Sequence, residues 1–143
     1  MDTRIEEIAR LVAASAPLVV KTLDPADRVA VRQWDAFVAA CPEATFFHKS
    51  GWQQVLKEVF AHRTHFLYAE RSGVIEGVLP LAQVKSVLFG NTLVSLPFAV
   101  YGGVAANSAA AVEALEGEAQ AIATRLGVDH LELRNLRHRH PDW

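Results

Sequence analysis

The residues best suited to chemistry gather in two short stretches of the sequence. In the first, His48 and Lys49 stand directly before Ser50, which has the spacing of a capping box with Gln53 and predicts that a helix begins at Gly51. The positive end of a helix disfavours the charged form of a histidine, so His48 would donate or accept a proton near neutral pH. In the alternative, His48 only closes the turn with a hydrogen bond.

The second stretch is Tyr101-Gly102-Gly103, which follows a predicted strand and precedes a predicted helix. Consecutive backbone amides of this kind form a nest for an anion, and Tyr101 adds a hydroxyl group. A loop that needs positive φ explains the glycines equally well, and packing explains the tyrosine. Further along, Glu132 and Arg134 share one face of a predicted strand, where they either line a cleft or pair with neighbours.

The histidines and the single cysteine do not predict a metal site. His62 and His65 span a predicted helix-to-strand junction, and His138 and His140 belong to a polar tail. Cys41 ends a predicted helix, where we interpret it as a small buried residue rather than a nucleophile. No phosphate-binding loop and no nucleophile elbow occurs in the chain.

The composition excludes several classes of protein. The length of 143 residues suits one domain, and 51% hydrophobic residues exclude intrinsic disorder. A net charge of −2 argues against a broadly basic nucleic-acid binder. The presence of a single cysteine favours the reducing cytoplasm. Prolines and glycines divide the apolar stretches 11–20 and 86–112, so neither stretch predicts a membrane span.

The elements that must position these residues follow from the periodicity of the apolar side chains. A short amphipathic helix within residues 1–16 is predicted as an appendage and linker. The body is then expected to be an α/β (α+β) fold, a mixed sheet with helices on its faces. Its expected elements are a strand at 17–23, a helix from 24 to 41, a helix from 51, a hairpin of 64–71 and 74–86 with a bulge or unpaired edge at Pro80, a strand at 92–96, a helix at 108–126 and a strand at 129–135.

This order of elements and a set of ordered motifs resemble a known family. The motifs are Thr45-Phe46-Phe47-His48-Lys49-Ser50-Gly51-Trp52, Gly77-Val78-Leu79-Pro80-Leu81, Tyr101-Gly102-Gly103-Val104 and Leu131-Glu132-Leu133-Arg134-Asn135. Together they resemble the FemAB-like family, in the branch associated with exosortase and PEP-CTERM exopolysaccharide systems. The fold implied is the GNAT N-acyltransferase superfold, and the resemblance runs from Pro17 to the C-terminus.

The resemblance implies a function for the whole protein and a part for this chain. Fem-type proteins consist of two GNAT-like domains and transfer an amino acid, usually from aminoacyl-tRNA, to an amine of a peptidoglycan precursor. Residues 17–143 would be the first domain, which recognises a cell-envelope or polysaccharide precursor and is inactive alone. It would be incomplete at its C-terminus, with an open sheet edge covered by the second GNAT-like domain or by a second copy. The implied substrate-binding residues are His48, Lys49, Trp52, Tyr101, Gly102, Gly103 and Arg134, with no metal and no assigned catalytic residue.

Two departures from the family patterns keep other functions open. Aligning Gly103 and Ala105 with the acyl-CoA motif of GNAT enzymes puts Val100 where Arg or Gln is expected, which disfavours acyl-CoA as the donor. Gln53 and Gln54 stand where Fem-type ligases carry basic residues for precursor phosphates. The alternatives are a CoA-dependent GNAT N-acetyltransferase and a non-catalytic GNAT-like binding module.

Overall fold

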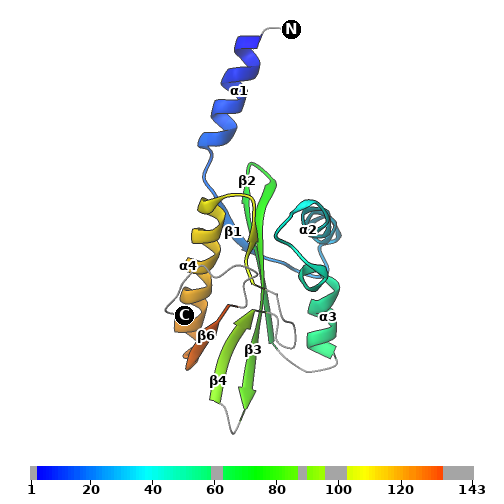
Figure 1. Ribbon diagram of the computed structural model, residues 1–143, viewed down its shortest axis with the longest axis vertical. Helices are drawn as coiled ribbons and strands as arrows, with labels where there is room; N and C mark the ends of the chain where they lie inside the picture. The colour runs from blue at the N-terminus through cyan, green and yellow to red at the C-terminus, as the bar shows by residue number, and fades with distance from the viewer. Residues whose placement is uncertain (1–2, 59–62, 87–89, 96–102, 134–143) are drawn as a thin grey trace.

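Residues 3–58, 63–86, 90–95 and 103–133 are described by the computed structural model (Figure 1). The elements are α1 (Thr3–Ser15), β1 (Val19–Thr22), α2 (Arg28–Ala40), the 3-10 helix η1 (Phe46–His48), α3 (Gly51–Glu58), β2 (Arg63–Arg71), β3 (Val74–Ser86), β4 (Gly90–Ser95), β5 (Ala105–Ala106), α4 (Ala109–Leu126) and β6 (His130–Glu132). The element order predicted from the sequence is therefore confirmed, with η1 and β5 as additions.

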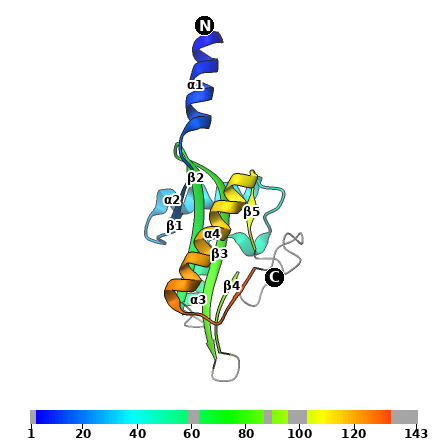
Figure 2. The same ribbon diagram turned by 90° about the vertical axis from the view of Figure 1, so that its left-hand side faces the viewer.

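The strands form one mixed sheet in the order β1-β2-β3-β4-β6, and β5 pairs with β3. Strands β1 to β4 are antiparallel neighbours, whereas β6 pairs parallel with β4. A parallel pair requires a crossover connection, which α4 provides. Helices α2 and α3 cover one face of the sheet and α4 covers the other (Figures 1 and 2).

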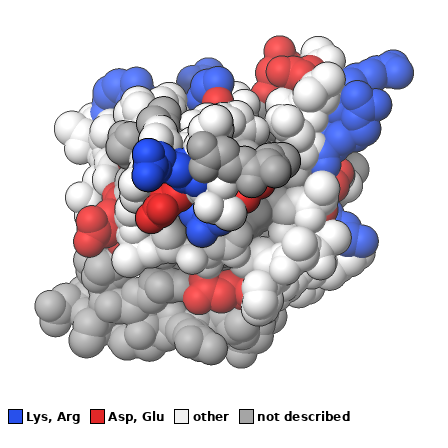
Figure 3. Space-filling view, turned by 90° about the horizontal axis from the view of Figure 1, so that it is seen from above, with Lys and Arg blue, Asp and Glu red and all other residues white. Residues whose placement is uncertain are grey.

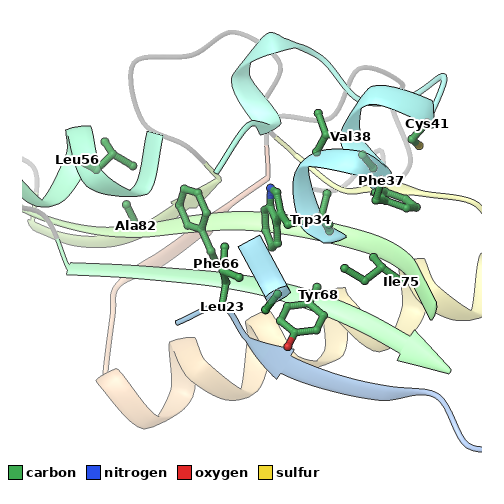
Figure 4. Close-up of a cluster of buried hydrophobic side chains, with 13 residues drawn as sticks. Leu23, Trp34, Phe37, Val38, Cys41, Leu56, Phe66, Tyr68, Ile75 and Ala82 are labelled. Atoms are coloured by element: carbon green, nitrogen blue, oxygen red, sulfur yellow. The ribbon is translucent and has the colours of Figure 1, made fainter. Parts of the chain in front are cut away.

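Alternation along the central strands gives each face its own hydrophobic core. On β2, Phe66 and Tyr68 contribute to the core under α2 and α3, while Leu67 and Ala69 contribute to the core under α4. Figure 4 shows the first of these cores, in which Trp34 of α2 stacks on Phe66 with the ring centroids 5.5 Å apart. Both faces of the sheet are therefore buried at its centre, which fixes the register of the hairpin.

Helix α4 is bounded as the sequence predicts. Ser108 is its N-cap and accepts a hydrogen bond from the backbone N–H of Ala111 at 3.1 Å. Gly127 ends it in the left-handed conformation at φ 63°, where a residue with a Cβ would be strained. These two caps set where the crossover begins and ends.

Helix α1 extends away from the body of the protein (Figure 1). Its apolar side chains Ile5, Ile8 and Leu11 are 66, 53 and 63% exposed. Seen from above, Lys and Arg side chains are interspersed with Asp and Glu, without a broad field of one sign on this face (Figure 3). Among the helices of the described residues, none is long and apolar enough to cross a bilayer.

Of the two alternatives predicted at Pro80, a bulge or an unpaired edge, the bulge is wrong, because the register shift lies elsewhere. Pro80 pairs in register with Phe66, and the shift falls where Ala69 opposes Gly77 and Glu70 opposes Ile75, which leaves Glu76 as the extra residue. On the other edge of β3, the described pairing with β4 stops at Leu81, and pairing resumes with β5 at Val78. Pro80, which has no N–H to donate, falls in this gap in the described pairing.

The predicted capping box of Ser50 and Gln53 is also wrong. The Ser50 backbone N–H and hydroxyl both donate to the carboxylate of Asp35, at 2.9 and 2.7 Å. The Gln53 amide instead donates to the carbonyl of Leu23 at 3.2 Å and reaches the Thr64 hydroxyl. The half-buried carboxylate of Asp35 and the buried partners of Gln53 compete successfully with the local cap, so tertiary contacts decide these two side chains.

Candidate functional site

The candidate site lies beside the start of β5, where η1 contacts the residues that lead into this strand. Strands β4 and β5 lie along the same edge of β3, with Leu81 opposite Ser95 and Val78 opposite Ala105. An unbroken antiparallel register would place residue 98 opposite Val78, so the described pairing with β3 resumes seven residues later in the sequence than that register requires. The residues that join the two strands, 96–104, are called the detour below, and Gly103 and Val104 are the ones that the structure describes. The glycine-containing motif predicted to bind substrate belongs to this detour, and its Gly103 is buried.

His48 joins the end of the detour to η1. Its ring Nε2 lies 2.7 Å from the carbonyl oxygen of Gly103. Its Nδ1 accepts a hydrogen bond from the backbone N–H of Thr45 at 2.9 Å and forms a capping box with that residue. The side chain is only 2% exposed, and this burial lowers the pKa of the imidazole below its ordinary value, although both backbone hydrogen bonds act in the opposite direction. The turn-closing hydrogen bond, one of the two alternatives for this residue, is thus confirmed.

Helix α2 contacts the same turn through a hydrogen bond from its Trp34 side chain. The indole N–H of the fully buried Trp34 donates to the carbonyl of His48 at 2.6 Å. In Figure 4 the indole nitrogen of Trp34 points away from the sheet. Together with the hydrogen bonds that Ser50 donates to Asp35, this contact fixes the C-terminal end of the turn.

An aromatic cluster lies on the outer side of this turn. Phe46, Phe47 and Trp52 contact one another with centroid distances of 5.7 to 5.9 Å. The ammonium of Lys49 lies 5.4 Å from the centroid of the Phe46 ring. Phe46 is 62% exposed, so the cluster presents an aromatic surface and a cation to solvent.

Carboxylates contact the start of α4. Glu76, the extra residue of the bulge, accepts a hydrogen bond from the Ser108 hydroxyl at 3.0 Å and pairs with Arg71 at 3.1 Å. Its backbone carbonyl accepts from the N–H of Asn107 at 2.8 Å. Glu43 accepts from the backbone N–H of Ala106 at 3.4 Å. Negative side chains therefore occupy donors that flank the helix N-terminus, where an anionic ligand would otherwise bind.

The structure brings together only some of the residues predicted to bind substrate. His48, Lys49 and Gly103 lie at one turn, and Trp52 joins them through the aromatic cluster. Tyr101, Gly102 and Arg134 lie outside the described residues, so their roles remain predictions, and Glu132 is exposed near the end of β6.

Sequence reasoning missed several residues that hold this site. Neither Trp34 nor Asp35 was identified as a residue that holds the turn. Thr45 was not identified as a cap, although its spacing from His48 fits a capping box in which histidine replaces Glu or Gln. That substitution is the signal that would have found it.

The other histidines and the cysteine contribute no metal centre in the part of the chain that the structure describes. Cys41 is buried at the end of α2, as interpreted from the sequence. His65 lies on β2, where burial and then the charges of Arg63 and Arg125 lower its pKa. His62, His138 and His140 fall outside the described ranges.

Comparison with known proteins identifies the fold. No protein-family model matches the sequence, and no curated protein matches it. A GNAT family acetyltransferase from Staphylococcus aureus subsp. aureus USA300_TCH1516 is 13% identical and superposes with a TM-score of 0.57, over 86% of this chain and 93% of that one. The chain has a GNAT-like fold. A transcriptional regulator from Bacillus halodurans C-125, 15% identical, has a TM-score of 0.56 over 88% of this chain and 86% of its own.

The elements around the candidate site are those of the GNAT-like fold. The parallel pair of β4 and β6 and the crossover helix α4 belong to it, and the detour between β4 and β5 lies directly before that helix. At these identities the likeness concerns the fold alone. The predicted incompleteness of the sheet remains a prediction, because residues 134–143 lie outside the described part of the chain.

Proposed function

We propose that this chain is the substrate-recognising first domain of a FemAB-like N-acyltransferase that acts on a cell-envelope or exopolysaccharide precursor in the cytoplasm. The whole protein would transfer an aminoacyl or acyl group to an amine of that precursor. The GNAT-like fold supports an acyltransferase role in general, and the four motifs listed in sequence order support the FemAB-like family. Residues 1–16 would remain an appendage, and a second GNAT-like domain would complete the reactive centre.

The observation that carries this proposal is the carboxylate contacts at the start of α4. The N-terminus of a helix such as α4 offers backbone N–H groups that can bind a diphosphate. Here Glu43 accepts from the backbone N–H of Ala106 and Glu76 accepts from the Ser108 hydroxyl, so carboxylates already occupy donors directly before that start. Since Val100 also replaces the Arg or Gln of the acyl-CoA motif, a domain that binds an acceptor precursor fits better than one that binds acyl-CoA.

The aromatic cluster supplies a recognition surface for such a precursor. An exposed ring such as Phe46 stacks against the apolar face of a sugar, and the Lys49 ammonium pairs with a carboxylate or phosphate of the same molecule. These groups are held by a turn that is hydrogen-bonded on its inner side, so little order has to be gained on binding.

Thermal unfolding in the presence of two probes tests the proposal. A nucleotide-linked muropeptide at 100 times its dissociation constant is expected to stabilise the chain by about 2.7 kcal/mol, and acetyl-CoA is expected to leave it unchanged. K49Q should weaken muropeptide binding several-fold, whereas K57Q, which changes a lysine outside the aromatic cluster, should not. Stabilisation by acetyl-CoA would instead support the alternative, a GNAT N-acetyltransferase. No shift with either probe would contradict precursor recognition and favour a non-catalytic module.

A further inference from the structure

The peptide group that precedes Lys49 is hydrogen-bonded at both of its polar atoms. Its carbonyl belongs to His48 and accepts from the indole N–H of Trp34 at 2.6 Å. Its N–H belongs to Lys49 and donates to the carbonyl of Phe46 at 3.3 Å. Because Trp34 is fully buried in the core beneath α2, this peptide group is tied to the most rigid part of the molecule.

The peptide group that follows Lys49 is bonded in the same way. Its carbonyl accepts from the backbone N–H of Trp52 at 3.2 Å, and its N–H, that of Ser50, donates to the Asp35 carboxylate at 2.9 Å. The Ser50 hydroxyl donates to the other oxygen of the same carboxylate at 2.7 Å. Since peptide groups are planar, holding both of them fixes the φ of −63° and the ψ of 142° at Lys49, and with them the direction of its Cα–Cβ bond.

The side chain that starts from this fixed backbone carries an exposed cation. The Lys49 ammonium lies over the Phe46 ring, 5.4 Å from its centroid. Within the described ranges, no carboxylate forms an ion pair with this ammonium. The two oxygens of Asp35 accept from Ser50 instead. The ammonium is therefore directed at an aromatic ring and at solvent, where it can pair with an anionic group of a ligand.

We propose that Asp35 is a positioning residue, which holds the Ser50 N–H and thereby presents Lys49 beside Phe46 as a preorganised binding group for a carboxylate or phosphate of the ligand. A lysine side chain loses much rotational freedom when it binds, and a fixed backbone reduces what remains to be ordered. The consequence for affinity rests on the proposed precursor recognition, whereas the positioning of Lys49 does not.

Two variants separate the two hydrogen bonds to Asp35. D35A removes the acceptor of the Ser50 N–H, whereas S50A removes the hydroxyl and leaves the N–H in place. Both should lower the free energy of unfolding, but only D35A should move Lys49. Relative to intrinsic rates, hydrogen exchange at amide 50 should accelerate about tenfold in D35A and stay within about threefold of wild type in S50A. The Lys49 side-chain protons should be shifted upfield by the Phe46 ring in wild type and S50A, and less so in D35A.

Affinity for a nucleotide-linked muropeptide tests the consequence, at a temperature at which every variant is folded. It should fall about five- to tenfold in D35A and less than about twofold in S50A. D35N, whose amide can accept from the Ser50 N–H and donate to its hydroxyl, should restore it. In a K49Q background, D35A should cost less than about twofold, because the group that it positions is absent. The nucleoside diphosphate and the peptide, titrated separately, distinguish a bound phosphate from a bound carboxylate.

Several outcomes would overturn the positioning role. Equal losses of affinity in D35A and S50A would make Asp35 a stabilising contact only, as would an undiminished loss from D35A in the K49Q background or an unchanged ring shift of Lys49 in D35A. Should D35A not fold, NMR coupling between the Ser50 nitrogen and the Asp35 carboxyl carbon in wild type decides whether the hydrogen bond exists, and its absence overturns the role. If the wild-type chain binds no muropeptide, the proposed function fails, while exchange and NMR still decide the role of Asp35.

Discussion

Trp34 contacts two separate parts of the molecule, β2 and η1, with one side chain. Its indole stacks on Phe66 of β2, meets Tyr68 edge-on at 6.4 Å, and donates to the carbonyl of His48. The first two contacts belong to the hydrophobic core and the third to the turn that carries the candidate site. Core packing and site geometry are therefore linked through a single residue.

Replacing Trp34 with phenylalanine should be costly for this reason. W34F leaves the His48 carbonyl without its donor and opens a cavity beside Phe66, so we expect a loss of about 2–4 kcal/mol in the free energy of unfolding. Urea denaturation measures it. W52F, in the partly exposed aromatic cluster, is the matched control and should cost less than about 1 kcal/mol. Equal losses would mean that the indole N–H contributes nothing.

Stability should also depend on pH through two histidines. The pKa of His48 is lowered by burial, and that of His65 is lowered by burial and two arginines, so both lie below the ordinary value of 6.5 that applies to the unfolded chain. Between 6.5 and the lower folded-state pKa values the unfolded chain binds more protons, so stability falls as the pH decreases through this window and levels off below it. H48Q should flatten part of this slope in urea titrations at successive pH values, and H65Q should flatten the rest. A slope unchanged in both variants would contradict this assignment.

At the scale of elements, the close approach of α4 to β3 depends on Gly77. A Cβ at this position would lie 2.9 Å from Leu115, 3.0 Å from Ala106 and 3.2 Å from Ala111. Two of these are Cβ atoms fixed to the backbone, so they yield only if β5 or α4 moves. Glycine at this point of β3 therefore lets the first turns of the crossover helix α4 pack directly on the sheet.

The prediction is that G77A and G117A have opposite effects. G77A should lower the free energy of unfolding by about 1–3 kcal/mol through overpacking. Gly117 lies within α4, where an added Cβ meets nothing within 4 Å, so G117A should raise stability by about 0.5–1 kcal/mol through helix propensity. Both are measured by chemical denaturation. A neutral G77A would mean that α4 has room to shift.

Local patterns in the sequence predicted the elements well, because their causes are local. The caps of α4 at Ser108 and Gly127 and the hairpin turn at Ser72 depend on residues within a few positions. Side chains whose hydrogen-bond partners lie far away in the sequence were not predictable in this way. Ser50 turns to Asp35, and His48 turns to Gly103, across 15 and 55 positions in the sequence. The candidate site was thus located by its motifs, while its hydrogen bonds required the fold.

At the scale of the whole molecule, one sheet separates two hydrophobic cores, and the residues described in these cores include none from α1. The core residues begin with Leu18 and Val20 on one face and Leu23 on the other. Both cores share the strands β2 and β3, so their unfolding should be coupled in one cooperative transition. Helix α1, which extends from the body in Figure 1, has no part in that transition.

Removal of α1 therefore provides the last test. A 13-residue helix whose apolar side chains Ile5, Ile8 and Leu11 are exposed is marginal in water, so deleting residues 1–15 should change the free energy of unfolding by less than about 0.5 kcal/mol and leave the urea m-value unchanged. Deleting residues 1–23 instead removes β1 and Leu23, which is 2% exposed, and should destabilise the chain by several times as much. A large loss in the shorter deletion would show that the exposed Ile5, Ile8 and Leu11 cover apolar surface of this chain or of a second copy in solution. The concentration dependence of the unfolding midpoint separates those two cases, because only contact with a second copy varies with protein concentration.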